Sequence, residues 1–266
     1  MKRFFALVLA IVLICCTFTS CDDVLAKFLP GMANDPNRLI EKADKALAEA
    51  PYAVTFKMNL ESNHKNVHDK LAVLNSEIPV TIDGENMSIN MSTKSGGYTI
   101  DMNMIVVDKV MYYSMTVLGE PARAKVAMND EQYEEFLKEY EPELAIGPDD
   151  FGELTVETMD DKQYISCNQL TQSGTKKIND MMEENFENTG VKTELSFTGL
   201  SFTIVIADGK YESVEVICGY DIKIDGGTYT VTCTMITEFS YDGVEAVTVP
   251  ADADEYQEYD YDDLMG

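Results

Sequence analysis

The feature that most constrains this chain is an alternation of apolar and polar residues that recurs along much of its length. The pattern is clearest at 52–60 and returns at 85–92, 98–106 and 110–117. A period of two places the apolar side chains on one face of a β-strand. Strands with a single apolar face form antiparallel sheets that need cover on that face only. The sequence therefore predicts a large antiparallel sheet with one covered face.

The C-terminal third has the same pattern with stronger turn signals. It predicts a four-stranded meander whose turns are Asp208-Gly209, Asp225-Gly226 and Asp242-Gly243. Within the first of these strands the apolar phase switches at Gly199, which predicts a β-bulge. A further hairpin is expected around Asp160-Asp161. The expected strands of the meander and this hairpin are 192–206, 211–224, 228–241, 244–249, 153–158 and 162–169.

Three segments have the spacing of amphipathic helices and are available to cover the sheet. They lie at 35–50, 129–140 and 171–188. The second begins with Asn129 and Gln132, which suit a capping box. The predicted fold is α+β: a large curved antiparallel sheet, or half-barrel, with about three helices on its concave face. We expect one such domain over 35–250, followed by a mobile acidic tail at 251–266.

The N-terminus has the features of a bacterial export signal. Residues 1–20 combine a basic pair, an apolar run at 4–14 too short to span a bilayer, and small residues before Cys21. This resembles a lipobox, in which the cysteine thiol receives a diacylglycerol, although Phe18 stands where leucine is usual. We expect Cys21 to be the lipid anchor, 21–34 a tether, and the protein to be held on the extracytoplasmic face of the cell membrane. The alternatives are a secreted protein cleaved near Ser20 and an uncleaved N-terminal anchor.

The charge balance excludes one class of partner. Asp and Glu number 47 against 20 Lys and Arg, for a formal net charge of −27. Such a chain repels nucleic acid and anionic headgroups. The 15 methionines and the absence of tryptophan suit either an adaptable apolar surface or simple core filling.

No motif supports catalysis, and we expect neither an enzyme nor a cofactor or metal site. Ser173-Gly174-Thr175-Lys176 matches S-x-x-K, but its companion motifs are missing or in the wrong order. His64 and His68 have a metal-compatible spacing within a polar region that reads as solvated loop with a short helix. The acidic runs at 149–153 and 252–263 lack the spacing of a calcium loop.

The lipobox, the opening LIEKADKALAEAPYAVTFKMNLE, the run from Gly97 to Met115 and the ending VTVPADADEY together resemble the LolA/LppX-like lipoproteins of bacteria. The resemblance implies a half-barrel that carries lipids or lipid-linked groups in an apolar cavity. The functional hypothesis is a membrane-anchored protein that binds a lipid or other amphiphile. The alternative is a structural or regulatory lipoprotein that binds another cell-envelope protein.

Strand register yields candidate ligand-binding residues. If Asp108-Lys109 is a two-residue turn, Met104 lies opposite Tyr113 and Met102 opposite Met115. With Phe56 and Met58, these four are expected to form one apolar patch on the concave face. Met104→Glu should then reduce amphiphile binding more than stability.

Register also yields a candidate disulfide. If Asp225-Gly226 is a two-residue turn, Cys218 lies opposite Cys233 with apolar pairs on both sides. The sequence then predicts a bridge between them, and the alternative is two buried thiols side by side.

Overall fold

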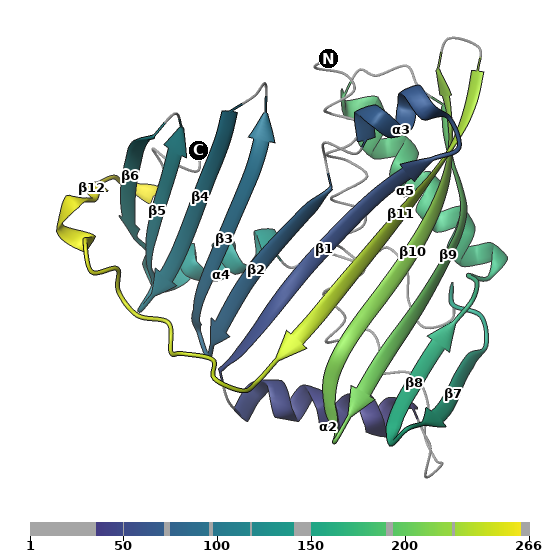
Figure 1. The fold of residues 1–266 in the computed structure, drawn as a ribbon, viewed down its shortest axis with the longest axis horizontal. Helices are drawn as coiled ribbons and strands as arrows, with labels where there is room; N and C mark the ends of the chain where they lie inside the picture. The colour runs from purple at the N-terminus through teal and green to yellow at the C-terminus, as the bar shows by residue number, and fades with distance from the viewer. Residues whose placement is uncertain are drawn as a thin grey trace. The chain divides into compact units, whose positions relative to one another are not determined.

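The structure is a computed structural model that describes residues 36–49, 51–71, 75–95, 98–117, 119–140, 150–189, 194–224 and 227–261. Within these residues twelve strands form one open mixed sheet in the order β12-β6-β5-β4-β3-β2-β1-β11-β10-β9-β8-β7. Four α-helices accompany the sheet in the described part of the chain (Figure 1). The prediction of a large, mostly antiparallel sheet with helices is confirmed. The expected signal peptide, Cys21 and the tether lie outside the described residues.

The chain divides into two compact units, each assembled from distant parts of the sequence. The first contains Met1–Ala46, Met58–Asn75 and Pro142–Thr237, and the second contains Leu47–Lys57, Ser76–Glu141 and Glu238–Gly266. Strands β1 (Tyr52–Ser62) and β11 (Gly227–Ser240) contribute residues to both units. The single domain expected over 35–250 stays a prediction.

The second unit is built on a meander of five consecutive strands. Each pairs with the next in antiparallel register. The strands are β2 (Ser76–Asp83), β3 (Asn86–Ser95), β4 (Tyr98–Val107), β5 (Val110–Val117) and β6 (Glu120–Ala127). The β4–β5 turn has Asp108 at φ 50° and Lys109 at φ 63°, the left-handed pair that a two-residue hairpin requires. The predicted β4–β5 register is thereby confirmed.

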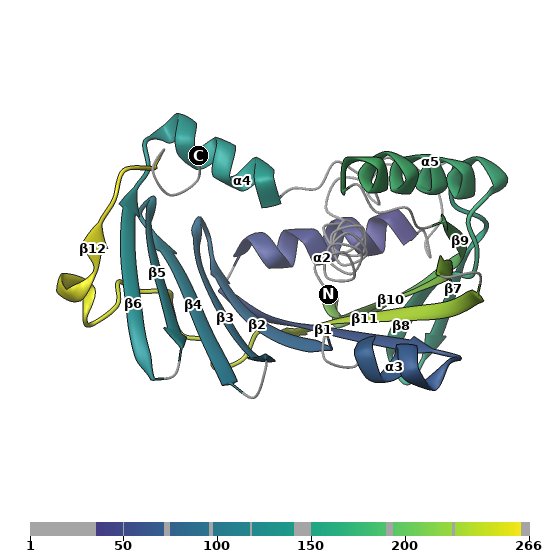
Figure 2. The ribbon, with the colours of Figure 1, turned by 90° about the horizontal axis from the view of Figure 1, so that it is seen from above.

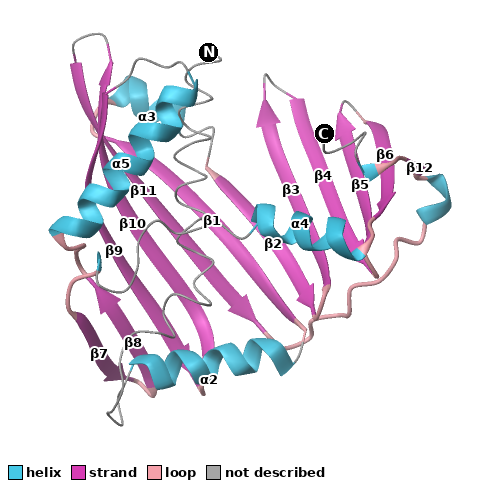
Figure 3. Ribbon diagram, turned by 180° about the vertical axis from the view of Figure 1, so that it is seen from behind, coloured by secondary structure: helices cyan, strands magenta, loops and turns pink. Residues whose placement is uncertain are grey.

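Helix α4 (Asp130–Tyr140) lies over one face of this meander (Figures 2 and 3). The predicted capping box is present: the Asn129 amide donates to Gln132 Oε1 at 3.0 Å, and the Gln132 amide donates to Asn129 Oδ1 at 2.9 Å. Tyr133 and Phe136 of the helix belong to a buried cluster, with their rings stacked 6.4 Å apart. The cluster comprises Val106, Met111, Val126, Met128, Tyr133, Phe136 and Tyr261.

The acidic tail, expected to be mobile, lies against β6 in the structure. Strand β12 (Gln257–Glu258) pairs in parallel with Ala124 and Lys125. Tyr256 and Tyr261 are 7% and 8% exposed, and Tyr261 belongs to the cluster under α4. The tail therefore covers the outer edge of β6 with its own backbone and aromatic side chains.

The first unit contains the longest strands and three helices. Its strands, besides parts of β1 and β11, are β7 (Leu154–Met159), β8 (Lys162–Cys167), β9 (Glu194–Ala207) and β10 (Lys210–Ile224). Gly219 pairs with Gly199 and Tyr220 with Phe197, so Thr198 is the extra residue of a bulge and the prediction at Gly199 is confirmed. Its helices are α2 (Pro36–Glu49, which ends in the other unit), α3 (Lys65–Leu71) and α5 (Gln172–Thr189).

Polar contacts fix these helices to the strands. Tyr211 Oη on β10 donates to Asp44 of α2 at 2.6 Å. The Phe197 amide on β9 donates to Asn179 Oδ1 of α5 at 2.9 Å. Helices α2, α4 and α5 lie within a residue or two of the bounds predicted for them. The short helix expected near His64 is α3.

Three sequence expectations need correction or completion. The segment 244–249 is not a strand: it runs without a ladder partner after the turn at Gly243. Strand β6 was missed because EPARAKVA has few large apolar residues, and β12 was missed because it is only two residues long. The Asp225-Gly226 turn lies outside the described residues, so the β10–β11 register stays a prediction.

Candidate functional site

One face of the second unit's meander is lined by methionines. Met91 of β3 lies opposite Met102 of β4, which lies opposite Met115 of β5. One step nearer to α4, Met104 lies opposite Tyr113. Directly opposed residues project from the same face of a sheet. We call these five residues, Met91, Met102, Met104, Tyr113 and Met115, the methionine face.

Burial changes along this face. Val106 and Met111, beneath α4, are 0% and 3% exposed. Met91, Met102 and Met115, farther along the same strands, are only half-buried. Met104 is also half-buried but packs against the cluster under α4. The methionine face is therefore continuous with a closed core at one end and partly accessible at the other.

The structure brings together four of the six predicted ligand-binding residues. Met102, Met104, Tyr113 and Met115 form the two adjacent pairs that the register predicted. Phe56 and Met58 are half-buried on β1, which β2 and β3 separate from β4 in the strand order. Phe56 therefore does not lie on a strand next to β4. Met58 belongs to the first unit, and its part in the patch stays a prediction.

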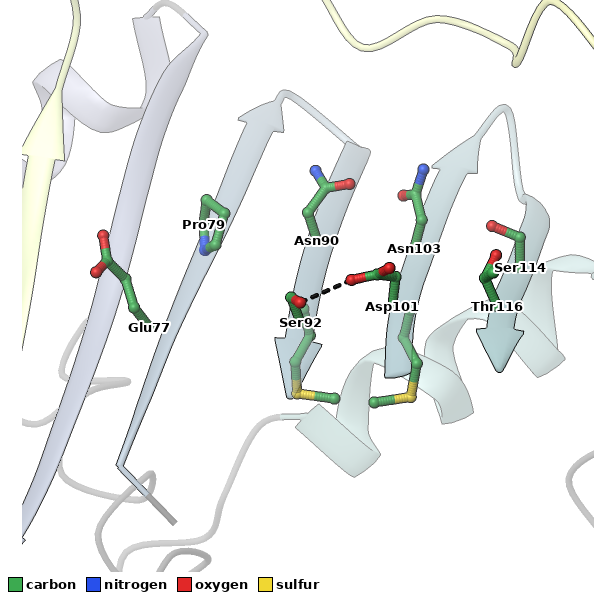
Figure 4. Close-up of a pocket in the computed structure, with 10 residues that line it drawn as sticks. Glu77, Pro79, Asn90, Ser92, Asp101, Asn103, Ser114 and Thr116 are labelled. Atoms are coloured by element: carbon green, nitrogen blue, oxygen red, sulfur yellow. Dashed lines mark hydrogen bonds between the residues drawn. The ribbon is translucent and has the colours of Figure 1, made fainter. Parts of the chain in front are cut away.

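The opposite face of the meander carries a polar pocket. The described β2–β3 pairing runs from Asp83↔Asn86 to Val80↔Ile89 and ends there, immediately before Pro79. Proline has no N–H to donate to the next ladder position. A pocket of about 410 Å³ lies where β2 and β3 part (Figure 4). We call it the fork pocket. Its lining residues are Glu77, Pro79, Asn90, Met91, Ser92, Asp101, Met102, Asn103, Ser114 and Thr116.

The polar groups of the fork pocket are mixed donors and acceptors. Ser92 Oγ donates to Asp101 Oδ1 at 2.6 Å across the β3–β4 pair (Figure 4). Asn103 Oδ1 is buried, and no donor among the described residues lies within hydrogen-bonding distance of it. Buried polar atoms in native proteins are nearly always hydrogen-bonded. This acceptor is therefore a position where a hydrogen-bond donor would be stabilised.

Ion pairs also occur elsewhere in the second unit. Lys57 lies 2.6 Å from Glu238, and a hydrogen bond to that carboxylate raises the pKa of Lys57. Lys109 lies 2.7 Å from Asp130 at the start of α4, which raises the pKa of Lys109 and lowers that of Asp130. Burial raises the pKa of Tyr133, whose hydroxyl donates to the Glu85 carbonyl at 2.7 Å. None of these groups lines the fork pocket or the methionine face.

The two cysteines predicted to be bridged are both buried. Cys218 and Cys233 are each 0% exposed, and the disulfide between them stays a prediction. Cys167 is also a buried thiol, and its Sγ donates to the Gln169 carbonyl at 3.1 Å.

The S-x-x-K match and the histidine pair, which gave no support for a catalytic or metal site in the sequence, lie at surface positions. Lys176 pairs with Asp180 along the exposed side of α5, with the lysine side chain 74% exposed. His64 packs edge-on against Tyr229 just before α3, at 5.1 Å between ring centroids. Among the described residues no group of three or more His, Cys, Asp or Glu could hold a metal. No described helix has the length and apolarity needed to cross a membrane.

Comparisons with known proteins give little further information. No family model and no curated protein matches the chain. The crystal structure of the ywiB protein from Bacillus subtilis is similar over 72% of this chain and 92% of its own, with 7% identity and a TM-score of 0.20. The crystal structure of MucB in complex with MucA(peri) is similar over 79% and 95%, with 9% identity and a TM-score of 0.12. TM-scores this low establish neither a shared fold nor a shared function.

Proposed function

We propose that this protein is a lipid-anchored extracytoplasmic lipoprotein that binds an amphiphile on its methionine face. The observation that carries the proposal is the half-buried row of Met91, Met102 and Met115 beside a fully buried core on the same strands. A face intended only as core would be expected to be covered along its whole length. An apolar chain that covers this row would gain about 0.8 kcal/mol for each methylene it buries.

The chemistry of methionine supports this assignment. The thioether chain is unbranched and flexible, so that neighbouring methionines can adapt to ligands of different shape. Opposed side chains on adjacent strands lie about 5 Å apart. The row therefore offers a strip three residues wide that matches an extended alkyl chain better than a compact polar molecule.

The membrane anchor is part of the same proposal. Cys21 follows an apolar run and small residues in the pattern of a lipobox. A diacylglyceryl group supplies two acyl chains, enough for stable attachment. Cys21→Ala should abolish incorporation of labelled fatty acid and release the protein from membranes. A variant that stays membrane-bound, beside a wild type that takes up no label, would contradict the anchor.

The resemblance to LolA/LppX-like lipoproteins is consistent with this function and extends it. It implies that the helices lie on the concave side of a half-barrel whose cavity holds the ligand. That finer arrangement is a proposal here, and it gives the methionine face its expected role as cavity wall.

The test separates ligand binding from packing. Met102→Glu and Met115→Glu place a charge on the accessible part of the methionine face, where burying it against an alkyl chain is costly. They should weaken binding of the fluorescent apolar probe N-phenyl-1-naphthylamine at least about tenfold while lowering the unfolding free energy by about 1 kcal/mol or less. Ser88→Glu, on the opposite face of β3, is the matched control.

Met104→Glu is a less suitable variant than the sequence suggested. Met104 packs against the cluster under α4, so a charge there should destabilise the second unit as well as the ligand site. If Met102→Glu and Ser88→Glu bind the probe equally well, or if the Met102 and Met115 variants lose stability in proportion to binding, these residues are ordinary core and the proposal fails.

One observation favours the alternative, a lipoprotein that holds another envelope protein. Strand β7 ends the described sheet in the first unit, and its last residue, Met159, is 56% exposed. An edge strand can accept a strand from a partner. Native mass spectrometry of protein extracted gently from membranes distinguishes the two functions: co-purifying lipid supports amphiphile binding, and a stoichiometric protein partner supports the alternative.

A further inference from the structure

We propose that the fork pocket is a carbohydrate-binding site, a function separate from amphiphile binding on the opposite face of the same strands. The pocket has a volume of about 410 Å³, within the range of roughly 300–1,000 Å³ typical of small-molecule sites. It exists because the β2–β3 ladder stops before Pro79, which leaves the first residues of β2 unpaired with β3.

The charges of the pocket select against anions. Glu77 and Asp101 contribute carboxylates, and none of the ten lining residues is basic. The formal net charge of the chain, −27, adds a repulsive field of the same sign. A phosphate or carboxylate ligand would therefore be repelled, which leaves neutral and cationic ligands.

The hydrogen-bonding groups then select hydroxyls over ammonium. Asn90 and Asn103 each present both an amide N–H donor and a carbonyl acceptor, and Ser114 and Thr116 present hydroxyls that can do either. A sugar hydroxyl also donates and accepts, so the hydroxyls of one ring can pair with such a surface throughout. An ammonium group only donates, so it can pair with the carboxylates and the amide oxygens but leaves the amide N–H donors of Asn90 and Asn103 unused.

The geometry places these groups together. Asn103 Oδ1 is buried and lacks a donor among the described residues, so a sugar O–H would satisfy it once the amide turns toward the pocket. Asn90 and Asn103 lie opposite one another on β3 and β4, and Ser114 lies opposite Asn103 on β5. Figure 4 shows these three side chains in one row above the Ser92–Asp101 hydrogen bond. The row presents three hydrogen-bonding groups at strand spacing of about 5 Å, a distance that suits alternate rather than adjacent hydroxyls of a pyranose ring.

The experiment uses saturation-transfer NMR on the purified full-length chain with methyl glycosides of glucose, galactose, mannose and N-acetylglucosamine. We expect transfer from the protein to at least one of them. Asn103→Ala should weaken that ligand about tenfold, the factor that corresponds to 1.4 kcal/mol. Ser114→Ala should weaken it severalfold. The matched control Ser88→Ala changes the same residue type on the same polar face but outside the pocket, and it should have no effect.

Further arms identify the source of the sugar. Octyl glycosides that bind more tightly than methyl glycosides would indicate the headgroup of a glycolipid. Equal affinities would indicate free glycan, and both results support a carbohydrate site. The proposal is overturned if no methyl glycoside shows transfer, if Asn103→Ala and Ser88→Ala bind equally, or if octylammonium rather than the glycosides is sensitive to Asn103→Ala. These outcomes do not depend on probe binding to the methionine face, so failure here leaves the amphiphile proposal standing.

Discussion

Replacing Tyr256 by alanine should undock the acidic tail from the edge of β6 without unfolding either compact unit. Tyr256 is 7% exposed, and its ring meets Tyr112 edge-on at 5.5 Å between centroids. Arg123 lies 6.0 Å from the centre of the Tyr256 ring and forms ion pairs with Asp252, at 3.1 Å, and with Glu255. The tyrosine therefore occupies the centre of the contacts that hold the tail.

The expected loss follows from the area that the ring buries. An aromatic side chain buries about 150–250 Å², roughly 100 Å² more than alanine would in the same place, which is about 2.5 kcal/mol at 25 cal/mol per Å². The edge-on contact adds about 0.5–1.5 kcal/mol. The ion pairs are partly solvated, and each is expected to contribute less than about 1 kcal/mol. Docking of the tail should therefore weaken by about 3 kcal/mol, which corresponds to roughly a hundredfold increase in local opening.

Hydrogen exchange over residues 251–261 measures this opening directly. The amide of Tyr259 donates to the Lys125 carbonyl at 3.0 Å, so its protection reports docking. Exchange in this segment should accelerate by about two orders of magnitude in Tyr256→Ala. Tyr259→Ala is the matched control, because Tyr259 is 37% exposed and should affect docking by less than about 1 kcal/mol. A segment that exchanges at the unprotected rate in the wild type, or equal effects of the two variants, would show that the docked tail does not persist in solution.

Three further predictions concern other parts of the molecule. Lys177→Met should destabilise the first unit by about 2 kcal/mol in chemical denaturation, because it removes the ammonium that lies 2.6 Å from the Asp150 carboxylate, which is only 3% exposed. The control Lys176→Met removes the exposed ion pair with Asp180 and should change stability by less than about 0.5 kcal/mol. Equal effects of the two variants would contradict this reasoning. Hydrogen bonds from Lys65 and Lys109 lower the pKa values of Asp69 and Asp130. The stability that these carboxylates contribute is therefore present above the unfolded carboxyl pKa of about 3.9 and is lost as the pH falls through the lower folded values. Denaturation curves should show this loss below about pH 4, and Asp130→Asn should make stability depend less steeply on pH there. Non-reducing peptide mapping of envelope protein should find Cys218 and Cys233 in one linked peptide pair, as the strand register predicts. Alkylation of both thiols without prior reduction would refute the bridge.

Local sequence patterns predicted those elements whose structure depends on neighbours in the chain. Alternation located β3, β4 and β5, and the two-residue turn at Asp108-Lys109 fixed the register of β4 against β5, because such a turn leaves only one way to pair the flanking strands. The capping box at Asn129 placed the start of α4 for the same reason: its two hydrogen bonds join residues three apart. The bulge at Gly199 was visible because the apolar phase of a single strand switches there.

Elements that depend on distant partners were beyond the sequence. Val244–Val249 alternates like a strand but finds no ladder partner, while EPARAKVA forms β6 because β5 lies beside it. Tyr256 and Tyr261 carry no signal that distinguishes them from Tyr259, and only the position of β6 decides that two of the three are buried. The separation of Phe56 from β4 in the strand order was beyond the sequence for the same reason, since strand order depends on pairing between strands that are far apart in the sequence.

For the candidate sites, too, some features followed from the local sequence and others only from the tertiary structure. The sequence alone determined which residues could form an apolar face, because side-chain direction in a strand follows from backbone periodicity. Only the tertiary structure decided that α4 covers Val106 and Met111 and leaves Met91, Met102 and Met115 half-buried. The sequence alone shows that Pro79 cannot donate a ladder hydrogen bond. The fork pocket also required β3 and β4 to bring Asn90 and Asp101 beside the point where the β2–β3 pairing ends. A pocket forms only when several strands take fixed positions relative to one another. The free energy that fixes those positions comes from long-range packing rather than from the conformational preferences of any one segment.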